Sequence, residues 1–271
     1  MEVFVRSVSV WGPGLQGWTA SQPILRGAQD YVASEANPPL PTLLSATERR
    51  RTGLVARLAL SVAQQASEMA GIAPGAIPSV FATANGDGTV VHSILGALAA
   101  GEPVSPTQFH NSVHNTAAGY WSIATGSQQP TNCVACHDST AAAALLKAVA
   151  EVRTTCRPLL LCVYDLPLPA PLNGSRPTMG SFGAGCVLAP DSDSSDLARL
   201  IRYDGSPPAP DSEAPRLRAL LDLARCNPAA RMLRLLETLA LGVADDFSMA
   251  LLDGRVEVRV RPCSPAPASS S

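Results

Sequence analysis

The chain contains 271 residues, of which 46% are hydrophobic and 15% are charged. This balance excludes an intrinsically disordered chain, and the length allows one large domain with a sizeable core. The formal net charge of −2 provides no basic surface for nucleic acid, and no apolar run approaches the length of a membrane span. The first residues predict a strand rather than a signal peptide, so we expect a cytoplasmic protein whose seven cysteines are reduced thiols.

The first two thirds of the chain alternate between expected strands and helices. A β-branched strand over residues 3–10 ends at a Gly-Pro-Gly turn, whereas residues 16–45 lack a clear period and are predicted to be irregular. Ser45 and Glu48 have the spacing of a capping box, and apolar residues then recur at helical spacing as far as Gly71. Further strands are expected at residues 78–84, 131–136, 158–164 and 185–188, and further helices at 91–101, 116–125 and 139–152.

The last third predicts a linker, two helices and a hairpin. Residues 205–215 are rich in proline, helices are expected near 216–225 and from Asn227, and strands at 248–252 and 255–261 flank an Asp-Gly turn. Alternating strands and helices imply an α/β fold, with a mostly parallel sheet covered by helices. The expected organisation is one domain over residues 1–261, with a loop or linker at 191–215, helices and a C-terminal hairpin at 216–261, and a disordered tail at 262–271.

The string Cys133-Val-Ala-Cys136-His137 has the C-x-x-C-H spacing of a c-type haem attachment site. It runs directly into an alanine-rich helix, and no export signal precedes it. Together with His110 and His114, the two cysteines also provide the ligand types of a tetrahedral zinc site. Both sites remain alternatives to the simpler interpretation, in which small cysteines and a hydrogen-bonded histidine pack in the interior.

Cys136 is the sharpest candidate for chemistry because it lies where a buried strand gives way to a helix. The helix dipole and free N–H groups at such a position favour the thiolate. A thiolate catalyst also needs histidines to move protons and stabilise an oxyanion, and no histidine follows residue 137. One possible function is therefore a small acyltransferase or thioesterase that uses Cys136 together with His110 or His114.

The order of motifs resembles the N-terminal half of a β-ketoacyl synthase. The segment from Val104 to Gly119 is followed by an apolar helix, by the strand and turn around Cys136, and by an alanine-rich helix. The Gly-Pro-Gly turn, the paired arginines before the long helix and the glycine-rich strand at 180–188 agree with this resemblance. It covers residues 1–190 and implies a thiolase-like fold, in which a layered sheet is covered by helices.

The sequence also departs from that family. A full condensing enzyme has a second thiolase-like half with two catalytic histidines, and the small residues that usually follow the nucleophile are replaced here by His137 and Asp138. The nucleophile position falls on Cys136, which we expect to be inactive alone. The chain is thus similar to the short chain-length-factor subunits of aryl polyene (xanthomonadin-type) clusters. In that family the factor pairs with a complete ketosynthase that acts on acyl carrier protein substrates, and it shapes the shared tunnel.

The resemblance further implies which residues form the tunnel and the subunit interface. Thiolase-type halves dimerise through the segment that corresponds to residues 104–115 and through the strand before Cys136. The Asn-x-x-x-Gly helix start of the family matches Asn115 and Gly119. The family residue that lines the end of the acyl pocket, two positions before the Asn, therefore corresponds to Val113. The leading hypothesis is an accessory subunit of type II fatty-acyl or polyene synthesis that needs no cofactor. Its expected tunnel and interface residues are Phe109, Val113, His114 and Asn115.

Overall fold

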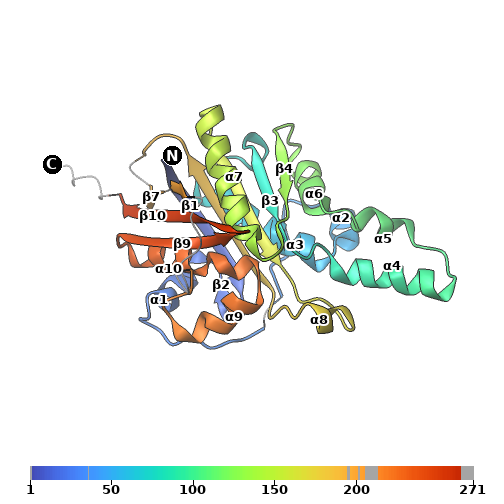
Figure 1. The fold of residues 1–271 in the computed structure, drawn as a ribbon. Helices are drawn as coiled ribbons and strands as arrows, with labels where there is room; N and C mark the ends of the chain where they lie inside the picture. Colours follow the sequence, from blue (N-terminus) through green and yellow to red (C-terminus); the bar gives the residue numbers. More distant parts are fainter. Residues whose placement is uncertain (1, 36, 194–195, 201, 205–212, 264–271) are drawn as a thin grey trace.

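The computed structural model describes residues 2–35, 37–193, 196–200, 202–204 and 213–263. These residues form a mixed α/β structure with a ten-stranded sheet, in which helices cover both faces of the central strands (Figure 1). Part of the predicted linker, at 205–212, and most of the predicted tail, at 264–271, lie outside the described residues. In the described part of the chain, we find no helix with the length and apolar character that crossing a membrane requires.

The sheet has the strand order β4-β3-β5-β6-β1-β7-β10-β8, with β2 beside β1 and β9 beside β10. Its described strands are β1 (Val3–Gly12), β2 (Leu15–Gln16), β3 (Ser79–Ala82), β4 (Thr131–Val134), β5 (Leu159–Asp165), β6 (Phe182–Ala189), β7 (Ala198–Leu200), β8 (Arg202–Asp204), β9 (Asp245–Leu251) and β10 (Gly254–Pro262).

The expectation of a mostly parallel sheet was wrong. Strand β3 pairs in parallel with β4 and β5, but the other pairings of the described strands are antiparallel. A parallel neighbour requires a long crossover, usually a helix of several turns. Between β5 and β6 the chain forms only α8 (Leu172–Ser175), so it returns beside β5 in the opposite direction.

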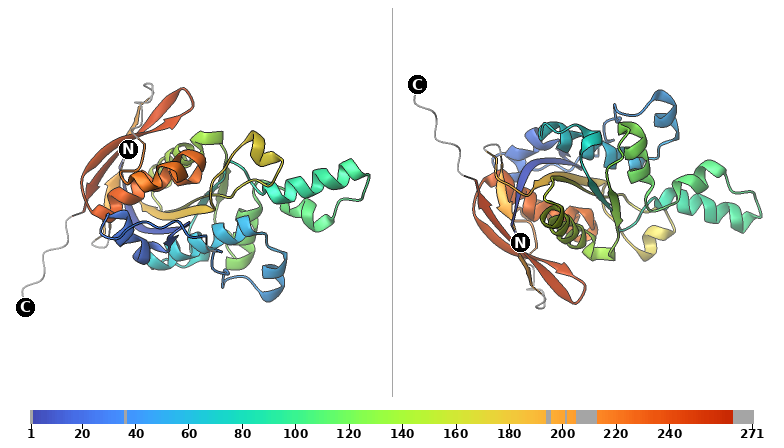
Figure 2. Two further views of the ribbon diagram at one scale, coloured as in Figure 1. Left: turned by 90° about the horizontal axis from the view of Figure 1, so that it is seen from below. Right: turned by 90° about the horizontal axis from the view of Figure 1, so that it is seen from above.

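Two helical layers enclose the central strands (Figure 2). Along β5, Leu160, Cys162 and Tyr164 join the cluster that contains α3 and α6, whereas the alternate residues join the cluster that contains α7. Because both faces are covered, β5 is a continuous apolar run rather than an alternating one. The longer helices are α1 (Trp18–Leu25), α2 (Ala46–Arg51), α3 (Leu54–Met69), α4 (Gly88–Ala100), α5 (Pro106–Asn111), α6 (Thr116–Thr125), α7 (Thr140–Thr155), α9 (Leu221–Cys226) and α10 (Leu233–Leu241).

Most of the predicted elements are confirmed to within a few residues, and two corrections concern the first helices. Residues 16–45 are not wholly irregular, because α1 buries Trp18, Ile24 and Leu25 against the core despite the proline inside it. The N-cap bond of the predicted capping box is present, since the Ser45 hydroxyl accepts the Glu48 N–H at 3.2 Å. It begins the short helix α2, and the chain becomes extended at residues 52–53 before α3 starts.

Helices α4 and α5 (residues 88–111, here called the arm) project from the body of the molecule, as Figure 1 shows. Gly88, at its base, is the one fully buried residue of α4. The helix is nevertheless rich in alanine, leucine and valine, and Leu95 and Leu98 are 51% and 60% exposed. Helix α4 therefore exposes an unusually apolar surface.

Candidate functional site

An open groove of about 430 Å³ lies between α5 and α6, where the arm returns to the body. It contains three of the four predicted tunnel and interface residues, namely Phe109, Val113 and Asn115. Its complete lining is Pro106, Phe109, His110, Val113, Asn115, Thr116, Gly119, Tyr120 and Ile123.

The walls of the groove are apolar and exposed. Phe109 is 67% exposed, Val113 47% and Ile123 60%. Asn115, Gly119 and Ile123 follow one another at intervals of four residues along α6, so that they lie on the same helical face. Ile123 was not predicted as a groove residue, although this spacing from Asn115 and Gly119 was the signal that could have identified it.

Polar side chains beneath the groove fix the turn between α5 and α6. Buried Asn111 donates from Nδ2 to the carbonyl of Arg51 at 3.0 Å, and its Oδ1 accepts the Tyr120 hydroxyl at 3.1 Å. Burial raises the pKa of Tyr120, so its hydroxyl remains a donor. The Thr116 hydroxyl contacts the carbonyl of Val113 at 2.7 Å. These bonds set the direction in which Val113 enters the groove.

The predicted helix start at Asn115 is confirmed, with a difference in its cap. Helix α6 begins at Thr116, and the Asn115 carbonyl accepts the Gly119 N–H at 2.9 Å. The Asn115 side chain makes no capping hydrogen bond with the start of the helix. It is instead an exposed polar group on the lining of the groove.

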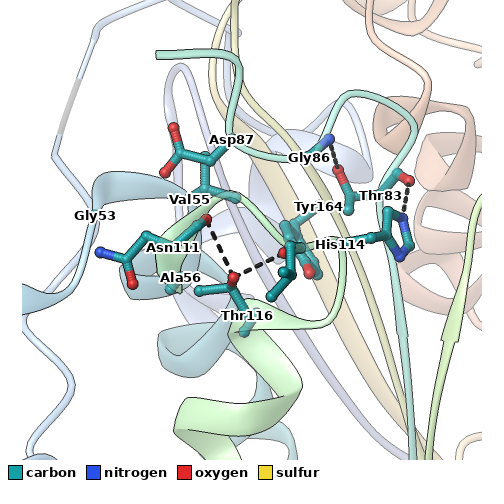
Figure 3. Close-up of a pocket in the computed structure, with 12 residues that line it drawn as sticks. Gly53, Val55, Ala56, Thr83, Gly86, Asp87, Asn111, His114, Thr116 and Tyr164 are labelled. Carbon is teal, nitrogen blue, oxygen red and sulfur yellow. Dashed lines mark hydrogen bonds between the residues drawn. The ribbon is translucent and has the colours of Figure 1, made fainter. Parts of the chain in front are cut away.

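His114 lies outside the groove and lines a second, small pocket, which Figure 3 shows. Its Nε2 donates to the carbonyl of Thr83 at 3.1 Å. The pocket has room for about one water molecule, since its volume is about 10 Å³. Val113 lines both the pocket and the groove. The structure therefore places His114 outside the groove that the other three predicted tunnel residues line, and gives it a contact with the end of β3.

Cys136 lies between the edge strand β4 and a three-residue 3₁₀ turn (His137–Ser139), so α7 begins slightly later than expected. The side chain is half-buried, and the Cys136 N–H donates to the Thr140 hydroxyl at 2.9 Å. Among the described residues, no hydrogen bond links Cys136 to a histidine. His110 contacts Asn111 instead, at 3.3 Å.

Charged residues next to Cys136 form a cluster that is compensated internally. Arg176 donates to Asp138 at 2.9 Å and also contacts His137. Arg231 lies 4.0 Å from the same Asp138 carboxylate and pairs with Glu213 at 2.8 Å. These pairs link the turn after the nucleophile position to α8 and to the C-terminal segment. The two arginines and the two carboxylates of this cluster thus balance one another's charge.

The metal alternatives gain no geometric support. Within the described ranges, no group of three or more His, Cys, Asp or Glu side chains has an arrangement that could hold a metal ion. Cys133 packs against the core on the α3 side, where burial raises the pKa of its thiol. A raised thiol pKa opposes the deprotonation that ligation requires.

Comparisons with known proteins agree with this architecture. A chain of the structure described as the ketosynthase ApeO in complex with its chain length factor ApeC, from Xenorhabdus doucetiae, is 17% identical, with a TM-score of 0.72 over 96% of this chain and 99% of that one. The ishigamide ketosynthase/chain length factor structure matches at 14% identity and a TM-score of 0.67, over 96% and 99% of the two chains. A β-ketoacyl synthase from Burkholderia phymatum matches at 12% and 0.66, over 97% and 99%.

No curated protein sequence matches this chain. The family model for the β-ketoacyl synthase N-terminal domain matches residues 24–220, which contain strands β3 to β8, the arm, the groove and Cys136. The chain therefore belongs to the β-ketoacyl synthase N-terminal domain family.

Proposed function

We propose that the protein is an accessory, chain-length-factor-like subunit that pairs with a full ketosynthase and forms part of its acyl tunnel. The observation that carries this proposal is the exposed apolar groove, in which Val113 has the position that the family resemblance assigns to the end of the tunnel and Phe109 forms part of the same wall. The system would be type II fatty-acyl or aryl polyene biosynthesis, with acyl carrier protein reaching the complex through the ketosynthase. The subunit would act in the cytoplasm.

The distribution of apolar surface supports a protein partner. The exposed apolar residues of α4, α5 and α6 include three leucine or phenylalanine side chains that are each more than half exposed: Leu95, Leu98 and Phe109. Exposed large apolar side chains are typical of surfaces that bind another protein. Strand β4 is at the end of the sheet order, and all four of its residues are half-buried. Its free edge offers backbone groups to a second subunit.

The C-terminal region supports a structural rather than a catalytic role. It contains no histidine, and it packs against α7 instead. Strands β9 and β10 contribute Phe247, Met249 and Val256 to the cluster around that helix. At the tip of the hairpin, the Leu252 N–H donates to the Ser139 hydroxyl at 3.0 Å. This segment would thus cover the face of the domain without supplying a proton-transfer group beside Cys136.

Cys136→Ala is expected to leave the condensation rate of the reconstituted complex within several-fold of the wild-type rate. The physical reason is that Cys136 has no histidine partner, whereas the full ketosynthase has its own nucleophile. Cys226→Ala is a matched control, because Cys226 is also a half-buried free thiol. The measurement is the rate of product formation on acyl carrier protein, with complex formation checked by size-exclusion chromatography.

Loss of a true nucleophile lowers the rate by many orders of magnitude. If Cys136→Ala abolished turnover in an intact complex while Cys226→Ala did not, this subunit would be catalytic and the accessory role would be wrong.

A further inference from the structure

Asp165, the last residue of β5, lies beneath the turn from which the arm begins. Its side chain is fully buried. One carboxylate oxygen, Oδ1, accepts three hydrogen bonds from that turn: the Thr83 hydroxyl at 2.8 Å, the Ala84 N–H at 2.9 Å and the Asn85 N–H at 3.0 Å. The other oxygen, Oδ2, is buried and has no hydrogen-bond partner among the described residues.

The turn is held by further bonds around this carboxylate. The Gly86 N–H donates to the Thr83 hydroxyl at 3.1 Å, and that hydroxyl in turn donates to Asp165. Asn85 donates from Nδ2 to the Thr178 hydroxyl at 3.0 Å, and its Oδ1 accepts Arg176 Nε at 2.7 Å. Asp165 is thus the innermost group of a network that spans the ends of β3 and β5.

Helix α4 starts immediately after this turn. Asp87 caps it by accepting the Val90 N–H at 3.1 Å, and Gly88 follows as the single fully buried residue of the helix. A Cβ atom on Gly88 would lie 2.3 Å from the Leu168 side chain, so the base of the helix is tightly fitted. Beyond the base, a bond from Gln108 to Ser93 at 2.6 Å joins α4 to α5. The direction of the arm is therefore set where its two ends join the body, at the turn before α4 and at Asn111, which is bonded to Arg51 and Tyr120.

The carboxylate of Asp165 is buried at an energetic cost. Burial raises its pKa from 3.8 to about 6, although the three hydrogen bonds and the Arg176 charge act in the opposite direction. The other groups that face it are Tyr164, whose own pKa is raised well above its usual value, and the uncharged Asn227 amide, which donates to the Asp165 carbonyl at 3.3 Å. His114 contacts the far side of the same turn through the Thr83 carbonyl.

We propose that Asp165 is a positioning residue for the arm: through its Oδ1 atom it holds the turn at residues 83–87 and so fixes how the apolar surface of α4 and α5 is presented to a partner. The partner in this statement rests on the proposed function, but the attachment of the arm does not. An opening of the turn would hydrate the carboxylate, and hydration favours the ionised form.

The sign of the pH dependence follows from this difference. The closed turn has the higher pKa, so it is most stable when Asp165 is protonated, and this advantage is lost as the pH rises from about 4 through about 6. A pKa difference of two units changes the equilibrium between closed and open turns by about 100-fold. The arm should therefore open more often at pH 7.5 than at pH 5.

Hydrogen–deuterium exchange of the full chain tests this proposal without any partner. For wild type, protection of the amides at residues 84–100, corrected for intrinsic exchange, is expected to be lower at pH 7.5 than at pH 5. Asp165→Asn keeps an acceptor oxygen and removes the charge, so the two pH values should give similar protection. Asp165→Ala removes the acceptor, and exchange should be at least about tenfold faster at both pH values, since each lost hydrogen bond contributes about 1 kcal/mol. His114 remains in all of these proteins, so their difference reports Asp165.

Glu237→Gln is the matched control. Glu237 is also a fully buried carboxylate with a raised pKa, and it accepts two backbone N–H groups, from Arg216 and Leu217. The control should leave exchange of the arm unchanged at both pH values. The proposal would be overturned if exchange of the arm in Asp165→Asn kept the wild-type pH dependence. It would also be overturned if Glu237→Gln changed exchange of the arm as much as the Asp165 variants did. Asp165→Asn alone decides the matter if Asp165→Ala does not fold.

Binding to a full ketosynthase tests the second half of the proposal. Asp165→Ala should weaken pairing at least about tenfold, and Glu237→Gln should not. If wild type bound no ketosynthase, the proposed function would fail while the exchange results still stood. If wild type bound and the loosened Asp165→Ala arm bound equally well, Asp165 would not position the arm for a partner.

Discussion

Phe109→Asp is expected to abolish stable pairing with the ketosynthase. Phe109 is 67% exposed on α5 and forms a wall of the groove between α5 and α6. An aromatic side chain in such a surface commonly contributes a large share of binding energy. Its replacement by aspartate also buries an unpaired charge, which costs about 3–5 kcal/mol. We therefore expect the Kd to rise by at least about 100-fold, measured by titration calorimetry or by the fraction of complex in size-exclusion chromatography.

The control for this prediction is Val32→Asp. Val32 is 70% exposed, and its carbonyl lies beside Gly14, in the turn after β1, which β3, β5 and β6 separate from the edge strand β4. The same introduction of charge at that site should leave the affinity unchanged. If both variants bound as tightly as wild type, the groove would not be part of the interface. If both lost affinity to the same extent, the cause would be general destabilisation.

The second large effect concerns the length of the product. Val113 lines the groove and enters it from a turn that hydrogen bonds hold in place. A packed interior cannot yield room for several extra carbons, so Val113→Phe should block the last extensions and shorten the polyene while the complex still assembles. Val113→Ala should allow equal or longer chains with little loss of initial rate. Mass spectrometry of products released from acyl carrier protein gives the distribution directly.

Leu95→Phe separates a tunnel effect from a general surface effect. Leu95 is 51% exposed on α4 and does not line the groove. Enlarging it should leave the product distribution unchanged. If neither Val113 variant altered product length in an intact complex, Val113 would be a packing residue and the tunnel assignment would be wrong.

The central layers of the fold could be predicted from local sequence patterns. Strand β5 is a continuous apolar run and was identified within one residue, and the regular helical spacing of α3 located the end of that helix within two residues, although the break between α2 and α3 was missed. Strand direction could not be derived in this way, because it depends on the length of the connections and on distant pairing. Helix α1 was missed since its proline suggests a break, whereas the burial of Trp18 and Leu25 against the core stabilises it.

The candidate site was predictable where residues are close in sequence. Phe109, Val113 and Asn115 lie within seven positions, and the structure brings them to one groove. His114 lies between two of them, and yet its Nε2 bonds to the Thr83 carbonyl at the end of β3. Asp165 was missed, since a single carboxylate at the end of an apolar strand gives no local sign that it accepts three donors from residues 83–85.

Co-expression with a complete ketosynthase encoded nearby, followed by size-exclusion chromatography with light scattering, tests the central claim most directly. The expected result is a stable complex of one copy of each chain, whereas this protein alone should self-associate or be poorly soluble because of its exposed apolar groove and arm. A well-behaved monomer that bound none of those ketosynthases would contradict the account.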